Sequence, residues 1–157
     1  MRPTDTLATT APNSPHGMAD PAISHSTALP NRAYTDSEEW LRERDEVISK
    51  TWAGLGFSND IATPGAVYPV TFMGLPLLMV RDQNGHAHVF HNVCRHRGMQ
   101  LAAEAGEAGL IIRCPYHKWG YDLNGQLKST PNIGGMGIHE IAGFRCADHA
   151  LAAVRCE

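Results

Sequence analysis

The residues best suited to bind a metal lie in two short motifs that are close together in the chain. The first is Cys94-x-His96, and after seventeen intervening residues comes Cys114-x-x-His117. A spacer of this length fits two loops that face one another across a hairpin. Thiolates are soft, strongly donating ligands and neutral imidazoles are weaker ones, so two of each can divide between two inequivalent iron atoms.

Two iron atoms, one held by two cysteines and the other by two histidines, form a Rieske [2Fe-2S] centre. Zinc is the alternative metal, because it also binds two cysteines and two histidines, although usually in pairs of like residues. Here each motif holds one residue of each type. In an extended loop, Cys94 and His96 lie roughly 6 to 7 Å apart at Cα, which suits ligands of neighbouring irons. We therefore predict that Cys94, His96, Cys114 and His117 hold a [2Fe-2S] cluster.

The sequences around both motifs, NVCRHRGMQL and CPYHKWGYDLNGQL, resemble the Rieske domain of the catalytic subunit of Rieske non-haem iron oxygenases, the aromatic-ring-hydroxylating family. The resemblance extends from about Tyr34 to the last residue. It implies that an NAD(P)H-linked reductase, sometimes through a ferredoxin, reduces the cluster. It also implies that electrons then pass to a mononuclear Fe(II), bound by two histidines and a carboxylate, which activates O2 in a dioxygenase or monooxygenase reaction.

In the resembling family, that iron lies in a catalytic domain that follows the Rieske domain. We find no credible ligands for it here, so we expect the oxygenase catalytic domain to be absent and the polypeptide to transfer electrons without being catalytically competent alone. A homotrimer, in which one subunit's Rieske centre serves its neighbour's iron, is expected only at full length. The alternative is an autonomous Rieske ferredoxin. A helix before the domain favours the oxygenase subunit, and the end of the chain at Glu157 favours the carrier.

Residues beside the predicted ligands are expected to set the reduction potential. Backbone N–H groups near Gly98, Tyr116 and Gly120 can donate to sulfur, and Trp119 either covers the cluster or belongs to the core. Respiratory Rieske proteins resemble this chain but add a disulfide and hydroxyl donors beside the cluster. Without these, we expect a potential at the low end of the Rieske range of about −150 to +300 mV.

Four basic residues lie in or beside the motifs. They would place positive charge around the cluster, as a docking surface for an acidic electron donor or as a solvated rim. They are Arg95, Arg97, Arg113 and Lys118.

Composition limits the remaining possibilities. The 157 residues fit one domain, and the net charge of −3 argues against nucleic acid or an anionic membrane as the main partner. With no apolar run of about 18 residues and no signal sequence, we expect no membrane span and a cytoplasmic location. The remaining cysteines, Cys146 and Cys156, could pair in an oxidising compartment, but in a reducing one they are small apolar residues.

Residues 1–33 are rich in Pro, Thr, Ser, Ala and Asn without a hydrophobic period, which is typical of a disordered arm, and His16 and His25 in it have no ligand-like surroundings. The Rieske domain is then predicted over 34–157. Its first element is a helix over roughly 36–52, with Thr35 and Glu38 as a capping box.

Short strands follow, separated by turn residues. They are predicted at 66–72, 77–82, 86–92, 110–114, 119–123 and 126–129, with turns at Gly74 to Pro76, Asn84-Gly85 and Asn124-Gly125. The segment 144–156 adds a further strand or two. This pattern predicts a mainly β fold, an antiparallel sandwich or partly open barrel with an N-terminal helix and the cluster at the tips of two hairpins.

Other histidines do not form a second metal site. On a strand, His86 and His88 share a face while His91 points to the other, so the three cannot converge on one ion and are interpreted as ordinary strand residues. His139 and Glu140 follow a glycine-rich loop without the strand-to-helix context of a phosphate site, and no role is assigned to them.

Overall fold

The computed structural model describes residues 28–157, which fall into two compact units that meet in sequence at Trp52 and Ala53. His16, His25 and most of the predicted N-terminal arm lie outside the described residues. In the part that the structure describes, no helix is both long enough and apolar enough to cross a membrane.

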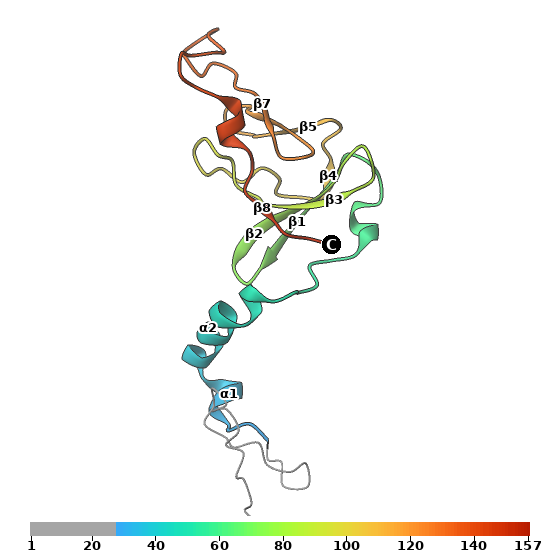
Figure 1. Ribbon diagram of the computed structural model, residues 1–157, viewed down its shortest axis with the longest axis vertical. Helices are drawn as coiled ribbons and strands as arrows, with labels where there is room; N and C mark the ends of the chain where they lie inside the picture. Colours follow the sequence, from blue (N-terminus) through green and yellow to red (C-terminus); the bar gives the residue numbers. More distant parts are fainter. Residues whose placement is uncertain (1–27) are drawn as a thin grey trace, which may run out of the picture. The chain divides into compact units, whose positions relative to one another are not determined.

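The first unit contains α1 (Arg32–Thr35), α2 (Ser37–Glu46) and the 3-10 turn η2 (Ile48–Lys50) (Figure 1). The predicted single helix over 36–52 is therefore too long, and its predicted cap is wrong. Asp36 is the N-cap, and its carboxylate accepts a hydrogen bond from the Glu38 N–H at 2.8 Å. The Thr35 hydroxyl instead donates to the Asn31 carbonyl at 3.1 Å. An ionised acceptor at the start of a helix also interacts favourably with the helix dipole, which favours Asp36.

The second unit is built on a five-stranded antiparallel sheet in the order β4-β1-β2-β3-β8. Its strands are β1 (Ala66–Phe72), β2 (Leu75–Arg81), β3 (Ala87–His91), β4 (Gly106–Glu107) and β8 (Ala153–Val154). A three-stranded sheet carries β5 (Ile111–Arg113), β6 (Gly120–Asp122) and β7 (Leu127–Ser129). The predicted mainly β, antiparallel class is confirmed, in its sandwich form.

Alternation along the strands divides the apolar residues between two cores. Leu78 and Val80 on β2 are fully buried and pack with Tyr121 and Leu127 of the smaller sheet, so the main core lies between the two sheets. Their neighbours Leu77 and Met79 point to the opposite face of the larger sheet and form a second cluster, with η3 (Ser58–Ile61) contributing Ile61. The two faces of one sheet thus serve different cores.

Two predictions of local structure differ from what is observed. The first turn is made by Met73 and Gly74, both at positive φ, and Pro76 lies inside β2 rather than in the turn. Positive φ at both central residues suits a tight hairpin between twisted strands. The segment 144–156 forms the 3-10 turn η4 (Cys146–His149) and the short strand β8, while β4 and η3 were not predicted.

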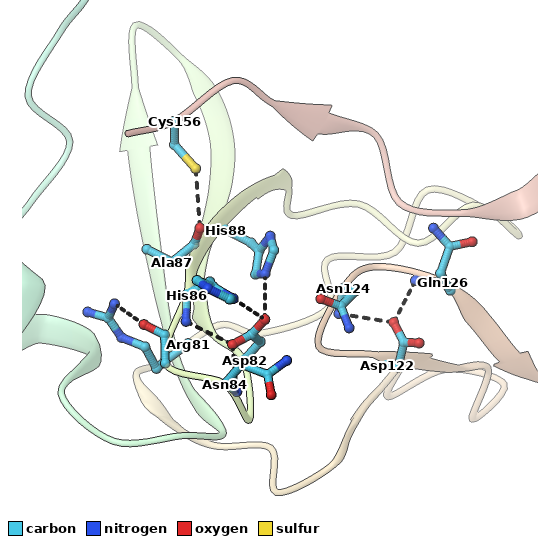
Figure 2. A network of polar contacts seen from close by, with 11 residues as sticks. Arg81, Asp82, Asn84, His86, Ala87, His88, Asp122, Asn124, Gln126 and Cys156 are labelled. Atoms are coloured by element: carbon cyan, nitrogen blue, oxygen red, sulfur yellow. Dashed lines mark hydrogen bonds and ion pairs between the residues drawn. The ribbon is translucent and has the colours of Figure 1, made fainter.

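The hairpins that follow β2 and β6 share one turn motif, Asp-x-Asn-Gly, shown in Figure 2. In the first, Oδ1 of Asp82 accepts the backbone N–H groups of Asn84 and His86, both at 2.8 Å. In the second, Oδ1 of Asp122 accepts the backbone N–H groups two and four residues on, at 3.0 and 2.8 Å. The aspartate in each case replaces backbone acceptors that the turn leaves out.

The second carboxylate oxygen distinguishes these hairpins. Oδ2 of Asp82 accepts from His86 Nδ1 at 3.3 Å and from His88 Nε2 at 3.1 Å, whereas Oδ2 of Asp122 pairs with Lys128 at 3.2 Å. The Asp82 side chain is 4% exposed. Burial raises the pKa of Asp82, but the hydrogen bonds from His88, His86 and Asn84 outweigh burial and hold this pKa well below its ordinary value. His86 and His88 therefore have a defined structural partner.

We expect Asp82→Asn to lower the free energy of unfolding at neutral pH, because an amide nitrogen cannot accept hydrogen bonds from the two imidazoles. With the folded-state pKa below the unfolded value of about 3.9, the carboxylate stabilises the fold above about pH 4, and this contribution is lost as pH falls further. Urea unfolding from about pH 7 to about pH 3 should show the gap to wild type narrowing in acid. Asp122→Asn, in the same turn motif but with a more exposed side chain, is the matched control. Equal stability of Asp82→Asn and wild type at neutral pH would contradict this account.

Candidate iron-sulfur site

Two loops with the same backbone hydrogen-bond pattern carry the predicted ligands. In the first loop, the Cys94 N–H donates to the Met99 carbonyl at 2.8 Å and the Gly98 N–H donates to the Cys94 carbonyl at 3.0 Å. In the second loop, the Cys114 N–H donates to the Trp119 carbonyl at 2.8 Å and the Lys118 N–H donates to the Cys114 carbonyl at 3.1 Å. Each cysteine is therefore fixed by both its own N–H and its own carbonyl.

A left-handed residue closes each loop at the fourth position after the cysteine. Gly98 has φ of 70° and Lys118 has φ of 61°. This conformation is routine for glycine, but for other residues it costs roughly 1 to 2 kcal/mol. The N–H of Gly98 donates to the Cys94 carbonyl and is thereby used in closing the loop.

The first loop is tied to the sandwich by Asn92, which is 1% exposed. Its side-chain nitrogen donates to the Ala102 carbonyl at 2.7 Å, and its side-chain oxygen accepts from the N–H groups of Leu101 and Ala102 at 3.1 and 3.0 Å. One buried amide thus joins the residues before and after the loop. These bonds use both acceptor sites of the amide oxygen and one of the two N–H donors, and they fix the width of the loop base.

The predicted ligand side chains meet in two like pairs, Cys94 with Cys114 and His96 with His117. Cys94 and Cys114 are each 2% exposed and both are free thiols. The rings of His96 and His117 lie 4.7 Å apart between centroids, at an angle of 66°. Two buried thiols and two paired imidazoles are the donor set of a Rieske centre.

His117 gives a direct observation that a further group fits here. Its Nδ1 atom is buried and, among the described residues, has no hydrogen-bond partner. A buried unpaired ring nitrogen is costly unless something binds it, and a metal ion is one such partner. Residues 28–157 contain no group of three or more His, Cys, Asp or Glu side chains arranged to hold a single metal ion.

Burial shifts the pKa of one cysteine and one histidine of the site toward the neutral form. Burial, together with the neighbouring Cys114 thiol, raises the pKa of Cys94, although Tyr121 and the His96 backbone oppose this. Partial removal from water, then the charges of His117 and Arg97, lowers the pKa of His96. A neutral imidazole is the form that binds a metal.

Tyr121 is a site residue that sequence reasoning missed. Its hydroxyl lies 3.3 Å from Cys94 Sγ and accepts the Arg95 N–H at 3.0 Å. Because its oxygen already accepts one hydrogen bond, its own hydrogen is free to donate to the sulfur. Burial and the adjacent Cys94 raise the pKa of Tyr121, so it stays a protonated donor. The expectation that no hydroxyl donates to this site is therefore wrong. The available signal was a tyrosine in a buried strand, whose hydroxyl needs a partner.

The other predicted neighbours of the ligands lie around the imidazoles. Trp119 is 3% exposed and its ring stacks on His96 at 4.5 Å and 10°, so it both covers the site and belongs to the core. Tyr116 is 58% exposed, with its ring 3.7 Å from that of His117. Arg97 lines a depression beside both histidines, together with Lys118 and the segment 131–133.

The predicted basic collar is narrower in the structure. Arg97 and Lys118 border the depression at the histidines, whereas Arg113 lines a separate depression with Glu104 and Glu107. Arg97 of the first loop and Lys118 of the second therefore place positive charge beside the imidazoles.

Facing cysteine and histidine loops on an antiparallel sandwich define an iron-sulfur protein of the Rieske class. Residues 51–149 match the family model of the Rieske [2Fe-2S] domain, so the chain belongs to this family, whose domain binds a [2Fe-2S] cluster. It is 32% identical over 129 residues to the carnitine monooxygenase oxygenase subunit of Escherichia coli K12, covering 82% of this chain and 33% of that protein. It is 36% identical over 124 residues to the benzene 1,2-dioxygenase subunit alpha of Pseudomonas putida, covering 78% and 26%.

Solved structures show the same relationship. One is a quaternary ammonium Rieske monooxygenase whose structure is described as revealing inter-subunit electron transfer, with a TM-score of 0.72 and 26% identity over 82% of this chain and 34% of that one. Another is naphthalene 1,2-dioxygenase from Rhodococcus sp. bound to indole, with a TM-score of 0.69 and 28% identity over 80% and 28%. The chain spans about a third or less of these relatives.

Proposed function

We propose that this chain is the electron-transfer part of a ring-hydroxylating-type oxygenase subunit. Cys94 and Cys114 would hold one iron of a [2Fe-2S] cluster, and His96 and His117 would hold the other. The observation that carries this proposal is the pairing of two buried free thiols with two facing imidazoles, one of which has an unpaired buried nitrogen. When bound, the cluster supplies reversible one-electron chemistry.

The donor set determines how easily an electron is taken up. Two ferric ions, two sulfides and two thiolates sum to zero charge if both imidazoles are neutral, which is two units less negative than a site with four cysteines. This explains why Rieske potentials, about −150 to +300 mV, lie above the roughly −400 mV of plant-type ferredoxins. His96 and His117 are therefore the residues that raise the potential, and the hydrogen bond from Tyr121 to Cys94 acts in the same direction.

The imidazoles also provide the path between the site and solvent. Both thiols are buried, whereas His96 is exposed and His117 is partly exposed. We assign His96 and His117 as the edge where electrons enter from a reductase or ferredoxin and leave for a mononuclear iron outside this chain. The relative described with inter-subunit electron transfer supports delivery to a neighbouring subunit, in a homotrimer when the catalytic domain is present.

Positive charge beside that edge supports an acidic electron donor. Arg97 and Lys118 are both exposed and border the depression at the histidines. Complementary charge raises association rates and orients the encounter. An autonomous ferredoxin is the second candidate, and it is supported by the hydrophobic core that lies within the unit Ala53–Glu157.

Reconstitution tests the proposed ligands. After anaerobic loading with iron and sulfide, we expect two irons and two acid-labile sulfides per chain. The reduced protein should give a rhombic EPR signal with an average g value below that of the free electron, and His117→Ala should lose this signal. Cys146→Ser, which removes a thiol outside both loops, is the control and should retain it. Wild-type protein that takes up zinc but no sulfide would contradict the proposal.

Replacing Tyr121 tests its role at the sulfur. Tyr121→Phe should lower the midpoint potential, because the lost hydrogen bond stabilises the more negative, reduced state more than the oxidised one. A fall of roughly 30 to 60 mV is expected, since 59 mV corresponds to a tenfold change in a one-electron equilibrium. Tyr116→Phe, whose exposed ring contacts His117, is the matched control. An unchanged potential in Tyr121→Phe, measured by redox titration with visible spectroscopy, would exclude this role.

Charge reversal tests the docking surface. Arg97→Glu should slow reduction by a plant-type ferredoxin several-fold at low salt, and the difference should disappear near 1 M salt, where the screening length is about 3 Å. Lys128→Glu makes the same change in net charge away from the histidines and should leave the rate close to wild type. Stopped-flow reduction, with the midpoint potential of each variant measured in parallel, gives the answer. Equal slowing by both variants would show that only net charge matters.

A further inference from the structure

The ring of Trp119 is held in place by a segment that is distant in sequence. Phe144 meets the indole edge-on, with 5.6 Å between ring centroids and 72° between the planes. His149 does the same at 6.1 Å and 80°. These two rings also stack on each other at 4.3 Å and 27°. Trp119 therefore stacks on His96 and is also contacted, nearly at right angles, by two further rings.

The segment that carries these rings is itself ordered. His149 ends η4, which packs against β7, and its Nδ1 lies 3.1 Å from the Arg145 carbonyl. A carbonyl only accepts hydrogen bonds, so this nitrogen carries the proton and the ring plane is fixed. Arg145 and Asp148 form a two-contact ion pair on the same turn, at 2.8 and 2.9 Å. The aromatic pair thus has little freedom to rotate.

A chain of contacts then leads from this segment to the site. The backbone of Trp119 closes the second loop through its carbonyl, so its Cα is fixed by Cys114. Its side chain still needs a constraint, and edge-to-face contacts are the geometry in which aromatic rings fix one another's orientation. His96 has one face against Trp119, so any tilt of the indole is passed to the plane of the imidazole.

From this geometry we infer that Phe144 and His149 are positioning residues for His96, acting through Trp119. They set the orientation of the imidazole plane and thereby the electronic properties of the site. This inference rests on the proposed function, because it concerns His96 as an iron ligand. It gives the segment 144–149 a role beyond filling the core.

The test uses variants that remove a ring but keep an apolar side chain. Phe144→Leu and His149→Leu should each shift the g values of the reduced-state EPR spectrum and the midpoint potential, while iron and sulfide content stay at the wild-type level. Phe144→Tyr retains the ring and should keep wild-type values, whereas His149→Phe retains the ring but loses the hydrogen bond to the Arg145 carbonyl and should give a smaller shift than His149→Leu. Phe90→Leu is the matched control: Phe90 belongs to the same core but stacks on His88, so its loss should lower stability without moving either readout.

A second readout does not need the cluster. In the zinc-free and iron-free protein, the ring protons of His96 should show an upfield NMR shift from the stacked indole, and this shift should be lost in Phe144→Leu and in His149→Leu. If wild-type protein binds no cluster, the proposed function fails but this measurement still decides the positioning. Folded Phe144→Leu and His149→Leu with wild-type g values, potential and His96 shifts would overturn the inference.

Discussion

The site depends on the closure of two six-residue loops without any covalent link between them. Each loop is closed by one hydrogen bond that the N–H of its cysteine donates and one that the carbonyl of the same cysteine accepts, with a left-handed residue at the fourth position. Cys94, Cys114, Cys146 and Cys156 are all free, so the two loops are held opposite one another by the packing of the sheets that carry them. The first loop follows β3 of the larger sheet, and the second lies between β5 and β6 of the smaller sheet. The core between the sheets therefore keeps the two loops aligned.

The surroundings of the thiols show how such a site tolerates buried sulfur. Burial in the apolar core raises the pKa of Cys94 and so disfavours its thiolate. The hydroxyl of Tyr121, 3.3 Å from the sulfur, acts in the opposite direction. The same tyrosine also receives the Arg95 N–H, so one side chain of β6 supports both a ligand and the backbone of the opposite loop. Because Tyr121 is fully buried at the centre of the main core, the stability of the fold and the properties of the site are linked through one residue.

Sequence patterns predicted the parts of this molecule that depend on local rules. Two mixed cysteine and histidine motifs indicated the family and four side chains that the structure brings together, and the Asn-Gly pairs marked the hairpins that follow Asp82 and Asp122. The strand β1 matches its prediction, because an apolar run between turn residues is a local signal. Helix α2 ended earlier than periodicity suggested, because apolar spacing continues beyond Glu46 although the α-helical hydrogen bonding does not.

What the sequence did not predict depends on contacts between distant segments. Tyr121 reaches a sulfur 27 residues earlier in the chain, and Phe144 and His149 reach Trp119 across the smaller sheet. Asp82 was overlooked because its importance lies in being buried beneath two histidines, which the spacing of the histidines alone does not reveal. The strands β4 and β8 have two residues each, too few to show alternation.

The two cysteines outside the loops lie on opposite sides of the larger sheet. Cys146 packs against the core between the sheets, whereas Cys156 packs with the cluster on the other face, and its thiol donates to the Ala87 carbonyl at 3.5 Å. The two thiols therefore pack in different cores and are not paired with each other in this structure. Because of this separation, the reaction of each thiol with a cysteine reagent should report the opening of a different core: the core between the sheets for Cys146, and the cluster on the other face of the larger sheet for Cys156.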